Sequence, residues 1–286
     1  MLTIVGSVQA QTDSTKTLEE AVIYTNKFRE KLQNTAQQAI VLTARGIAKV
    51  NAGVTGDLLS ESGQVFVQKS QQGGSSPVLR GFEASRVLLL VDGIRMNNAI
   101  YRAGHLQNAV TIDQNMLESV EVLFGPGSTL HGSDALGGVI NFRTKQANLS
   151  STNKLETSGN SFFRYRTVNH EITGHVDVNV GGKKWAWLQS YTVSKFGDLK
   201  MGGNYPAKYP NFGRRSQYIQ TANGVDQIVT NSDDRIQKFS GYKQWDLTQK
   251  ILLKSSDKLT HSFNVQLSNS TDIPRYDRLQ DKKNFG

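Results

Sequence analysis

The chain has 286 residues, with 33 lysine and arginine residues against 24 aspartate and glutamate residues, which gives a formal net charge of +9. It has no cysteine, and this excludes disulfides, thiol nucleophiles, cysteine-bound zinc and iron–sulfur clusters. No stretch approaches the roughly 18 consecutive apolar residues of a membrane-spanning helix. The strands of a membrane β-barrel give a weaker signal, so that class stays open. The basic residues are spread among strands and loops, which argues against nucleic acid as a partner.

The first ten residues resemble the end of a secretory signal peptide. They are uncharged and mostly apolar or small, and they finish with Val8-Gln9-Ala10, a small-x-small cleavage pattern. We therefore expect a signal-peptide remnant at residues 1–10, and the alternative is a frayed N-terminus. Residues 281–286 finish without a closing strand, and we expect the chain to be a fragment.

The first half of the chain reads as a small mixed α+β domain. Val87–Val91 is a continuous apolar run, typical of a strand covered on both faces, and Asp92-Gly93 predicts a tight turn after it. Residues 55–63 predict a short helix capped by Thr55 or Asp57. Further strands are expected at 40–42, 64–67, 120–124 and 139–142, and a second short helix at 116–118.

The second half alternates between apolar and polar side chains over segments of about ten residues. Such alternation is typical of membrane-barrel strands, which have lipid on one side and a wet lumen on the other. A soluble β-sandwich gives the same alternation, so this pattern alone leaves both open. The expected strands are 162–167, 172–180, 185–195, 245–253 and 259–267.

The connections between these strands differ in length. Tight turns are expected at 181–183 and 255–258, whereas a long polar connector runs from about residue 196 to residue 242. If the strand at 162–167 runs outward, the tight turns fall on the periplasmic side and the long connector falls outside. Outer-membrane barrels have short periplasmic turns and longer extracellular loops, so the connection lengths favour the barrel.

No motif in the chain indicates an enzyme. Gly127–Ser133 approaches a phosphate-binding loop but lacks the lysine that meets the phosphates. The chain has no nucleophile-elbow, zinc-protease or paired-carboxylate motif, and its histidines are scattered. We therefore expect a protein that is not an enzyme.

Two long segments carry a specific resemblance. Pro77–Phe82 with Arg86–Arg95, and Leu117–Ser128 continuing through His131–Asn141, strongly resemble the plug domain of TonB-dependent outer-membrane receptors. The resemblance covers about residues 18–145. Its motif residues are Arg80, Gly81, Arg86, Asp92, Gly93, Arg95, Glu121, Gly125, Gly132, Gly137 and Gly138. Arg80, Arg86, Arg95 and Arg143, with Glu118 and Glu121, are expected to pair within the plug or across to the barrel wall.

The resemblance implies an α+β plug domain followed by antiparallel β-strands of a transmembrane β-barrel, which has roughly 22 strands in this family and is incomplete here. It also implies the outer membrane of a Gram-negative bacterium, contact with outer-membrane lipid, and TonB with its inner-membrane energising complex as partner. The expected division is a signal-peptide remnant at 1–10, a TonB-box segment at 11–30, the plug domain at 31–148 and the N-terminal part of the barrel at 149–286.

An extended segment near the N-terminus of the family's mature proteins is the TonB box, which pairs edge-on with a strand of TonB. Glu20–Thr25 occupies that place here, with Ala21, Val22, Ile23, Tyr24 and Thr25 as its core. Adding a strand to a sheet edge supplies main-chain hydrogen bonds with little demand on sequence. The alternative is an ordinary strand of the plug.

The resemblance places the loops Gln71–Ser76 and Met96–Gln107 at the outward apex of the plug, where Gln71, Gln72, Ser75, Asn97 and Asn98 would face cargo. Gly104-His105-Leu106 and the segment 272–279 are similar to the haem and haemoglobin receptor branch. There, His105 would bind the haem iron, and Tyr101 and Arg102 would stack on the ring or meet a propionate. Haem or a haem protein is thus the first cargo expected, with a ferric siderophore, cobalamin or a glycan as alternatives. No permanent cofactor is implied, since haem or a ferric chelate would be transported. A binding or adhesion module without transport is the alternative of another class.

Overall fold

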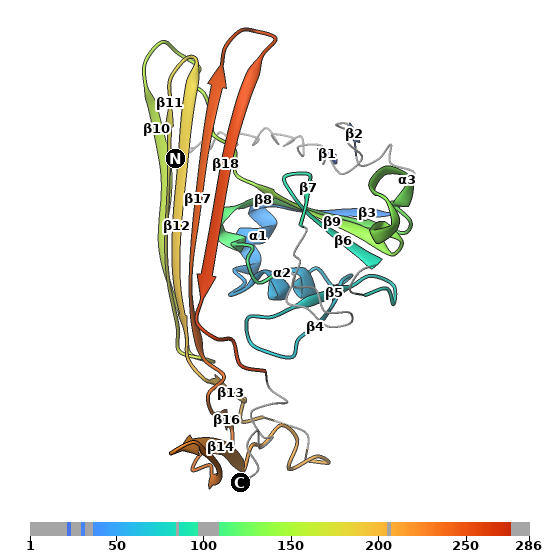
Figure 1. The fold of residues 1–286 in the computed structure, drawn as a ribbon, viewed down its shortest axis with the longest axis vertical. Coiled ribbons are helices and arrows are strands. Elements are labelled where there is room, and N and C mark those ends of the chain that lie inside the picture. The colour runs from blue at the N-terminus through green and yellow to red at the C-terminus, as the bar shows by residue number, and fades with distance from the viewer. Residues whose placement is uncertain are drawn as a thin grey trace, which may run out of the picture.

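A computed structural model describes residues 22–23, 30–31, 37–83, 86–96, 109–204 and 207–275. Its main parts are an α+β domain and a tall antiparallel sheet that stands beside it (Figure 1). The last strand of the domain ends at Thr144 and the first strand of the tall sheet begins at Glu156.

The α+β domain is built on a five-stranded sheet with strand order β3-β8-β9-β6-β7, in which β6 and β9 run parallel and the other neighbours antiparallel. Its strands are β3 Ala39–Thr43, β6 Val87–Val91, β7 Ile94–Arg95, β8 Leu117–Phe124 and β9 Gly138–Thr144. Its helices are α1 Ala44–Val50, α2 Thr55–Glu61, the 3-10 helix η3 Gln114–Met116, α3 Ser128–His131 and the 3-10 helix η4 Ser133–Ala135. Two small ribbons pair β4 Phe66–Gln68 with β5 Ser76–Val78, and β1 Val22–Ile23 with β2 Glu30–Lys31.

Strand β6 is covered on both faces, as its continuous apolar run predicts. Leu89 faces the core shared with Leu58 and Leu59 of α2, whereas Leu88 packs on the opposite side with Val139 and Ala135. The turn after β6 is also confirmed, because Asp92 has φ 51° and Gly93 has φ 80°, the pair of positive values that a two-residue hairpin turn needs.

Two local predictions in this domain are wrong. Neither Thr55 nor Asp57 caps α2, because Thr55 donates a hydrogen bond of 2.6 Å to the Ile112 carbonyl and Asp57 pairs with Lys69 at 2.5 Å. The helix expected at 116–118 is instead the 3-10 helix η3, since Leu117 already opposes Thr144 in the sheet. In both places a tertiary partner overrides the local preference.

The five predicted strands of the second half are confirmed as one antiparallel sheet, which we call the strand wall. Its order is β10-β11-β12-β17-β18. The strands are β10 Glu156–Arg166, β11 Glu171–Gly181, β12 Trp185–Phe196, β17 Tyr242–Lys254 and β18 Thr260–Ser270.

The two faces of the strand wall are inverted relative to a soluble sheet. The face toward the α+β domain buries polar side chains, with Thr173 0%, Asp177 4% and Lys250 3% exposed. The opposite face leaves Phe163 72% and Phe263 60% exposed. A soluble sandwich buries its apolar face, so this arrangement decides for membrane-barrel strands.

The two ends of the strand wall carry different connections (Figure 1). Turns 182–184 and 255–259 lie at one end, and the long connector, residues 197–241, lies at the other. The connector holds two small ribbons, β13 Leu199–Lys200 with β16 Ile236–Gln237, and β14 Gln217–Ala222 with β15 Val225–Thr230. The short turn 167–170 joins β10 to β11 at the connector end, so one tight turn lies there too. Among the described residues, no helix is long and apolar enough to cross a membrane.

Candidate functional site

The α+β domain is fastened to the strand wall by polar contacts, and the first of them centres on Asp92. The positive-φ turn between β6 and β7 points this carboxylate at the wall. Oδ2 of Asp92 accepts hydrogen bonds from Lys250 at 2.9 Å in β17, from Asn264 at 3.1 Å in β18 and from Thr144 at 2.6 Å. One carboxylate therefore ties the central sheet of the domain to two strands of the wall.

A second layer of contacts supports this turn from inside the domain. Gly93 donates to Asn141 at 3.1 Å, and Asn141 donates to the buried Glu121 at 3.3 Å. Arg143 lies 4.0 Å from Glu121, which confirms one of the expected pairs. The other expected charges stay within the domain, where Arg95 pairs with Asp134 at 2.7 Å, Arg80 bonds to Gln38 and lies over the Phe124 ring, and Arg86 and Glu118 are exposed.

The second fastening is a chain of polar groups across β11 and β12. Lys145 pairs with Asp177 at 2.7 Å, and Nε2 of His175 lies 3.1 Å from the same carboxylate. Nδ1 of His175 lies 2.7 Å from the Thr192 hydroxyl, which donates to Asp113 at 2.6 Å. Lys145 and Asp113 belong to the α+β domain, so this series of polar contacts begins and ends in the domain and passes through the wall between them.

The third fastening joins the end of α1 to the connector end of β10. Asn51 ends the helix in a left-handed conformation with φ 49°, which turns its carbonyl and its side chain toward the wall. Arg164 donates to the Asn51 side chain at 3.2 Å, and Arg166 donates to its carbonyl. Both arginines also pair with the buried Glu171, at 2.7 Å for Arg164 and 3.4 Å for Arg166.

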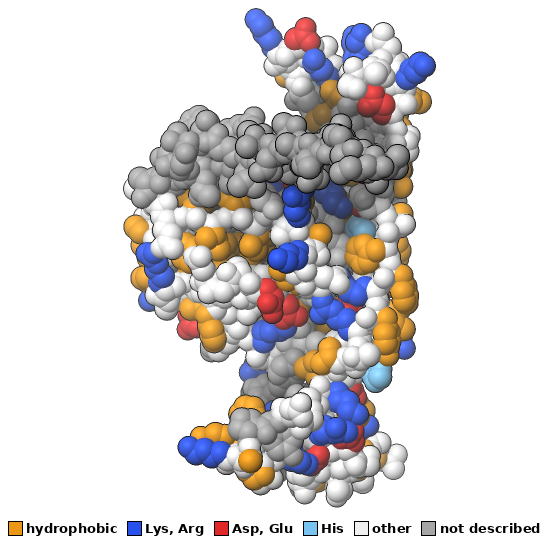
Figure 2. Space-filling model, turned by 180° about the vertical axis from the view of Figure 1, so that it is seen from behind, with side chains coloured by type: hydrophobic (Ala, Val, Ile, Leu, Met, Phe, Trp, Pro, Cys, Tyr) orange, Lys and Arg blue, Asp and Glu red, His pale blue; other side chains and the backbone are white. Residues whose placement is uncertain are grey.

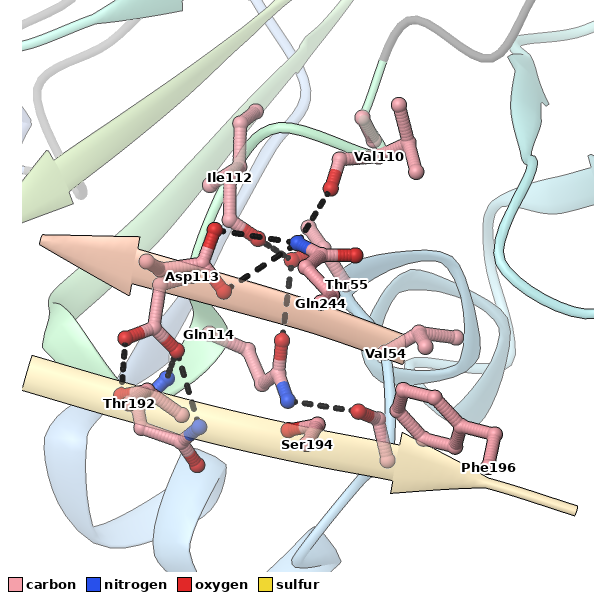
Figure 3. A pocket seen from close by; sticks show the side chains of 14 residues that line it. Val54, Thr55, Val110, Ile112, Asp113, Gln114, Thr192, Ser194, Phe196 and Gln244 are labelled. Carbon is pink, nitrogen blue, oxygen red and sulfur yellow. Dashed lines mark hydrogen bonds between the residues drawn. The ribbon is translucent and has the colours of Figure 1, made fainter. Parts of the chain in front are cut away.

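The seam between domain and wall is tightly filled where Figure 3 views it. Thr55, Gln114 and Gln244 line a cavity of about 10 Å³, room for about one water molecule. Gln114 donates to the Gly53 carbonyl at 2.7 Å and Gln244 to the Val110 carbonyl at 3.0 Å. This part of the seam holds the two bodies together and has no space for a cargo molecule.

Larger openings flank the seam on both sides. One, of about 880 Å³, lies between the β6–β7 turn and β17–β18, and its lining includes Asp92, Arg143, Lys250 and Asn264. Another, of about 380 Å³, lies between α1 and β10–β11, and its lining includes Asn51. The Asp92 and Asn51 fastenings therefore stand at the edges of these two openings.

The loop 71–76, expected to face cargo, binds the connector end of the wall instead. Gln72 donates to the carbonyls of Gly197 at 3.1 Å and Ser240 at 3.2 Å, and accepts from Asn169 at 2.7 Å. Gln71 donates to the Ile273 carbonyl at 3.2 Å. Gln71, Gln72 and Ser75 are all buried, and in this arrangement the two glutamines brace the loop.

Most of the other predicted site residues lie outside the described part of the chain, and their roles stay predictions. These are Ala21, Tyr24, Thr25, Asn97, Asn98, Tyr101, Arg102 and His105. Val22 and Ile23 of the predicted TonB box form β1 and pair with Lys31 and Glu30.

Sequence reasoning did not assign Lys145, Asp177 or Lys250 to the seam. The signal was available, because Asp177 and Lys250 stand on the polar side of strands whose other side is apolar. A charge at such a position needs a partner across the lumen, and here the α+β domain supplies one.

In the connector, Asp233 links the two sides of the ribbon formed by β13 and β16. It pairs with Lys200 at 3.1 Å and with Arg235 at 3.2 Å. Hydrogen bonds from Arg235 and then Lys200 lower the pKa of Asp233 from its ordinary value of 3.8 to about 2. Asp234 pairs in turn with Arg214 at 2.7 Å, so the connector carries its own small charge network.

Comparison with known proteins identifies the α+β domain. Residues 31–139 match the family model described as TonB-dependent Receptor Plug Domain. The chain carries the plug domain of the TonB-dependent receptor family. Members of this family are transporters and receptors of the Gram-negative outer membrane, and they are not enzymes.

Curated relatives extend the match. The chain is 35% identical over 155 residues to a vitamin B12 transporter, BtuB, of Vibrio vulnificus strain CMCP6, covering 52% of this chain and 24% of that protein. It is 26% identical over 278 residues to a hemin receptor of Yersinia pestis, covering 94% of this chain and 38% of that protein. The chain thus spans about a quarter to two fifths of the length of these relatives.

Solved structures agree on the fold. The copper transporter OprC superposes with a TM-score of 0.62 at 16% identity, covering 82% of this chain and 32% of its own. The pyoverdine receptor FpvA of Pseudomonas aeruginosa PAO1 gives a TM-score of 0.61 at 16% identity, covering 87% and 30%. The architecture is therefore a plug followed by antiparallel strands that resemble part of a TonB-dependent receptor barrel.

Proposed function

We propose that the protein imports cargo across the outer membrane, energised through TonB. The observation that carries this proposal is the polar seam between plug and strand wall, which consists of ion pairs and hydrogen bonds at Asp92, Asp177 and Asn51. Each such contact contributes only about 0.5–1.5 kcal/mol in net terms between neutral groups and about 1.5–3 kcal/mol where a group is charged, because water replaces the contact when it breaks. A seam of this kind holds the plug in place and still allows it to shift under an applied force.

TonB would apply that force through Glu20–Thr25. Val22 and Ile23 pair as a short strand with Glu30 and Lys31, and that pairing involves few main-chain hydrogen bonds. A strand of TonB would replace β2 as the partner and transmit tension to the plug.

Haem, or haem taken from a haem protein, is the cargo we propose first. The similarity to a hemin receptor runs along 94% of this chain, through plug and strands alike. Tyr101, Arg102 and His105 lie in the loop that the family places at the apex. An imidazole is an ordinary axial ligand of haem iron, and a guanidinium suits a propionate.

Cobalamin or a ferric siderophore is the second candidate. The higher identity, 35%, is to a vitamin B12 transporter, but it covers only 52% of this chain. Similarity between two receptors reflects their shared transport mechanism as well as their cargo. The match to the vitamin B12 transporter, which covers about half of the chain, is therefore weaker evidence for the cargo than the match to the hemin receptor along nearly the whole chain. An adhesion module without transport is the alternative of another class.

Titration of the full-length protein with haem tests the cargo. Wild type is expected to give a Soret shift that His105→Ala weakens, whereas His261→Ala, on the exposed face of β18, leaves it unchanged. Equal haem spectra and affinities for all three proteins would remove His105 from the site. Cobalamin and ferric siderophores titrated in parallel identify the second candidate, and bound cargo without uptake would favour adhesion.

A further inference from the structure

Two lysines stand side by side on the outward face of the strand wall, at its connector end. The register pairs Lys195 of β12 with Lys243 of β17, and Lys195 also opposes Ile172 of β11. Both lysines are exposed. The Thr271 amide donates to the Lys243 carbonyl at 2.9 Å and the Lys243 amide donates to the Thr271 hydroxyl at 3.0 Å, which fixes the end of β17 next to this pair.

Within the described part of the chain, the two charges have no ion-pair partner on that face. Among the ion pairs of the described residues, none involves Lys195 or Lys243. Three neighbouring carboxylates are turned elsewhere, since Glu171 and Asp246 are buried toward the plug and Asp198 accepts from the main chain of Ser240 and Gly241. The exposed Asp272, next to Thr271, is in none of the ion pairs of the described residues. Like charges directly opposite each other across an antiparallel pair are destabilising, so an anion bound between the two lysines would relieve their repulsion.

Two aromatic side chains follow the lysines on the outward face, Trp245 in the adjacent row opposite Val193 and Tyr191 in the row after it. Tyr191 and Trp245 are 42% and 36% exposed, with ring centroids 6.5 Å apart. The outward face continues from there to Trp185, opposite Leu253, near the other end of the wall, as a mostly apolar band that is interrupted midway by Gln189 opposite Gln249. From Trp185 to Val193 it measures roughly 26 Å along the strand at about 3.3 Å per residue, close to the height of the lipid-facing band of such barrels.

This order of residues matches the levels of a lipid leaflet. Apolar side chains meet acyl chains, Tyr and Trp lie at the interface, and lysines reach the headgroup phosphates just beyond. Figure 2 shows hydrophobic side chains along the side of the wall that faces away from the plug. The lysine pair therefore lies at the headgroup level of the leaflet on the connector side.

We propose that Lys195 and Lys243 together bind the phosphate group of a membrane-lipid headgroup in the leaflet on the connector side. Two ammonium groups on adjacent strands bridge one phosphate through charge-assisted hydrogen bonds, and the phosphate removes their mutual repulsion. The inference rests on the membrane placement in the proposed function, but not on any cargo or on TonB.

The test measures lipid binding to the full-length chain in a phosphate-free detergent. The probe is lipid A carrying its two phosphates, with dephosphorylated lipid A and inorganic phosphate as separate arms. Native mass spectrometry is expected to show retained lipid A on wild type, about tenfold weaker retention on the Lys195→Gln/Lys243→Gln variant, and little retention of the dephosphorylated form. Lys183→Gln/Lys184→Gln, at the opposite end of the wall, is the matched control and retains lipid A like wild type.

Thermal unfolding with and without lipid A distinguishes lost lipid binding from a folding defect in the Gln/Gln variant. Without lipid the Gln/Gln variant is at least as stable as wild type, because the repulsion is gone, whereas added lipid A raises the Tm of wild type more than that of the variant. Lys195→Arg/Lys243→Arg keeps binding and covers the case in which the Gln/Gln variant does not fold. The proposal would be overturned if wild type and the Gln/Gln variant retained lipid A equally, or if the Lys183→Gln/Lys184→Gln control lost lipid A as the Gln/Gln variant does. It would also be overturned if a folded Arg/Arg variant did not bind lipid A, or if inorganic phosphate displaced lipid A. Cargo uptake is not measured, so a failure here is distinct from a failure of the proposed function.

Discussion

Nζ of Lys250 lies 2.9 Å from Oδ2 of Asp92, and this ion pair joins β17 of the strand wall to the β6–β7 turn of the plug. Lys250 is 3% exposed at its side chain and Asp92 is 16% exposed. The pair also stands at the edge of the opening of about 880 Å³. The same ion pair therefore holds the plug against the wall and borders the opening beside the plug.

Replacing Lys250 with Met is expected to loosen this side of the plug. Asp92 keeps Thr144 and Asn264 but loses its only cationic partner among the described residues, at a cost of about 2 kcal/mol for a charged hydrogen bond. Faster amide exchange in β6, β7 and β9 of the full-length protein is the expected result. Lys258→Met, in the exposed turn 255–259, serves as control, and unchanged exchange in the Lys250 variant would contradict the role of this pair.

Removing the carboxylate of Glu171 is expected to destabilise the connector end of the wall. Arg164, 6% exposed at its side chain, would be left without its carboxylate, and breaking a buried pair from one side costs about 3–5 kcal/mol. Glu171→Ala should lower the Tm of the full-length protein in detergent, whereas Glu118→Ala on the exposed plug surface should not. A Tm unaffected by Glu171→Ala would mean that water or a rearranged Asn51 satisfies the arginine.

The connector is expected to resist acid until well below neutral pH. The pKa of Asp233 is lowered from 3.8 to about 2, so its contribution is fully present above pH 3.8 and is lost as the pH falls through about 2. Limited proteolysis with pepsin should spare the ribbons at 199–237 at pH 4 and cut them increasingly toward pH 2. In Asp233→Asn that pH dependence should be weaker, and an identical profile in the two proteins would assign the acid sensitivity to another group.

Adding a methyl group at Gly73 is expected to displace the loop 71–76 from the wall. A Cβ atom there would lie 2.6 Å from the Tyr242 ring and hydroxyl, a distance that forces the loop or the ring to move. Overpacking of this kind costs about 1–3 kcal/mol, and it would break the contacts of Gln72 with Gly197 and Ser240. Exchange of the loop amides and the Tm report the change, with Gly202→Ala, which meets no atom within 4 Å, as control. If Gly73→Ala had the Tm and loop amide exchange of wild type, the Tyr242 side chain would move aside at little cost and the contact would not hold the loop.

Local pattern in the sequence determined much of the architecture. The continuous run at Val87–Val91 predicts a strand covered on both faces, Asp92-Gly93 predicts the turn, and period-two alternation predicts all five strands of the wall. These features depend on residues adjacent in the chain, whose side-chain directions are fixed by the backbone period. The motif segments likewise sufficed to recognise the plug, which the family model confirms.

Only the tertiary structure decided which polar side chains meet. Thr55 looks like a helix cap but bonds Ile112, and Gln72 looks like a cargo contact but bonds Gly197, Ser240 and Asn169. Asp92 and Lys250 are separated by 158 residues, and sequence alone gives no reason to pair them. A buried charge takes whichever partner the packing of two separate sheets brings within hydrogen-bond distance, and that distance is not encoded in the neighbourhood of either residue.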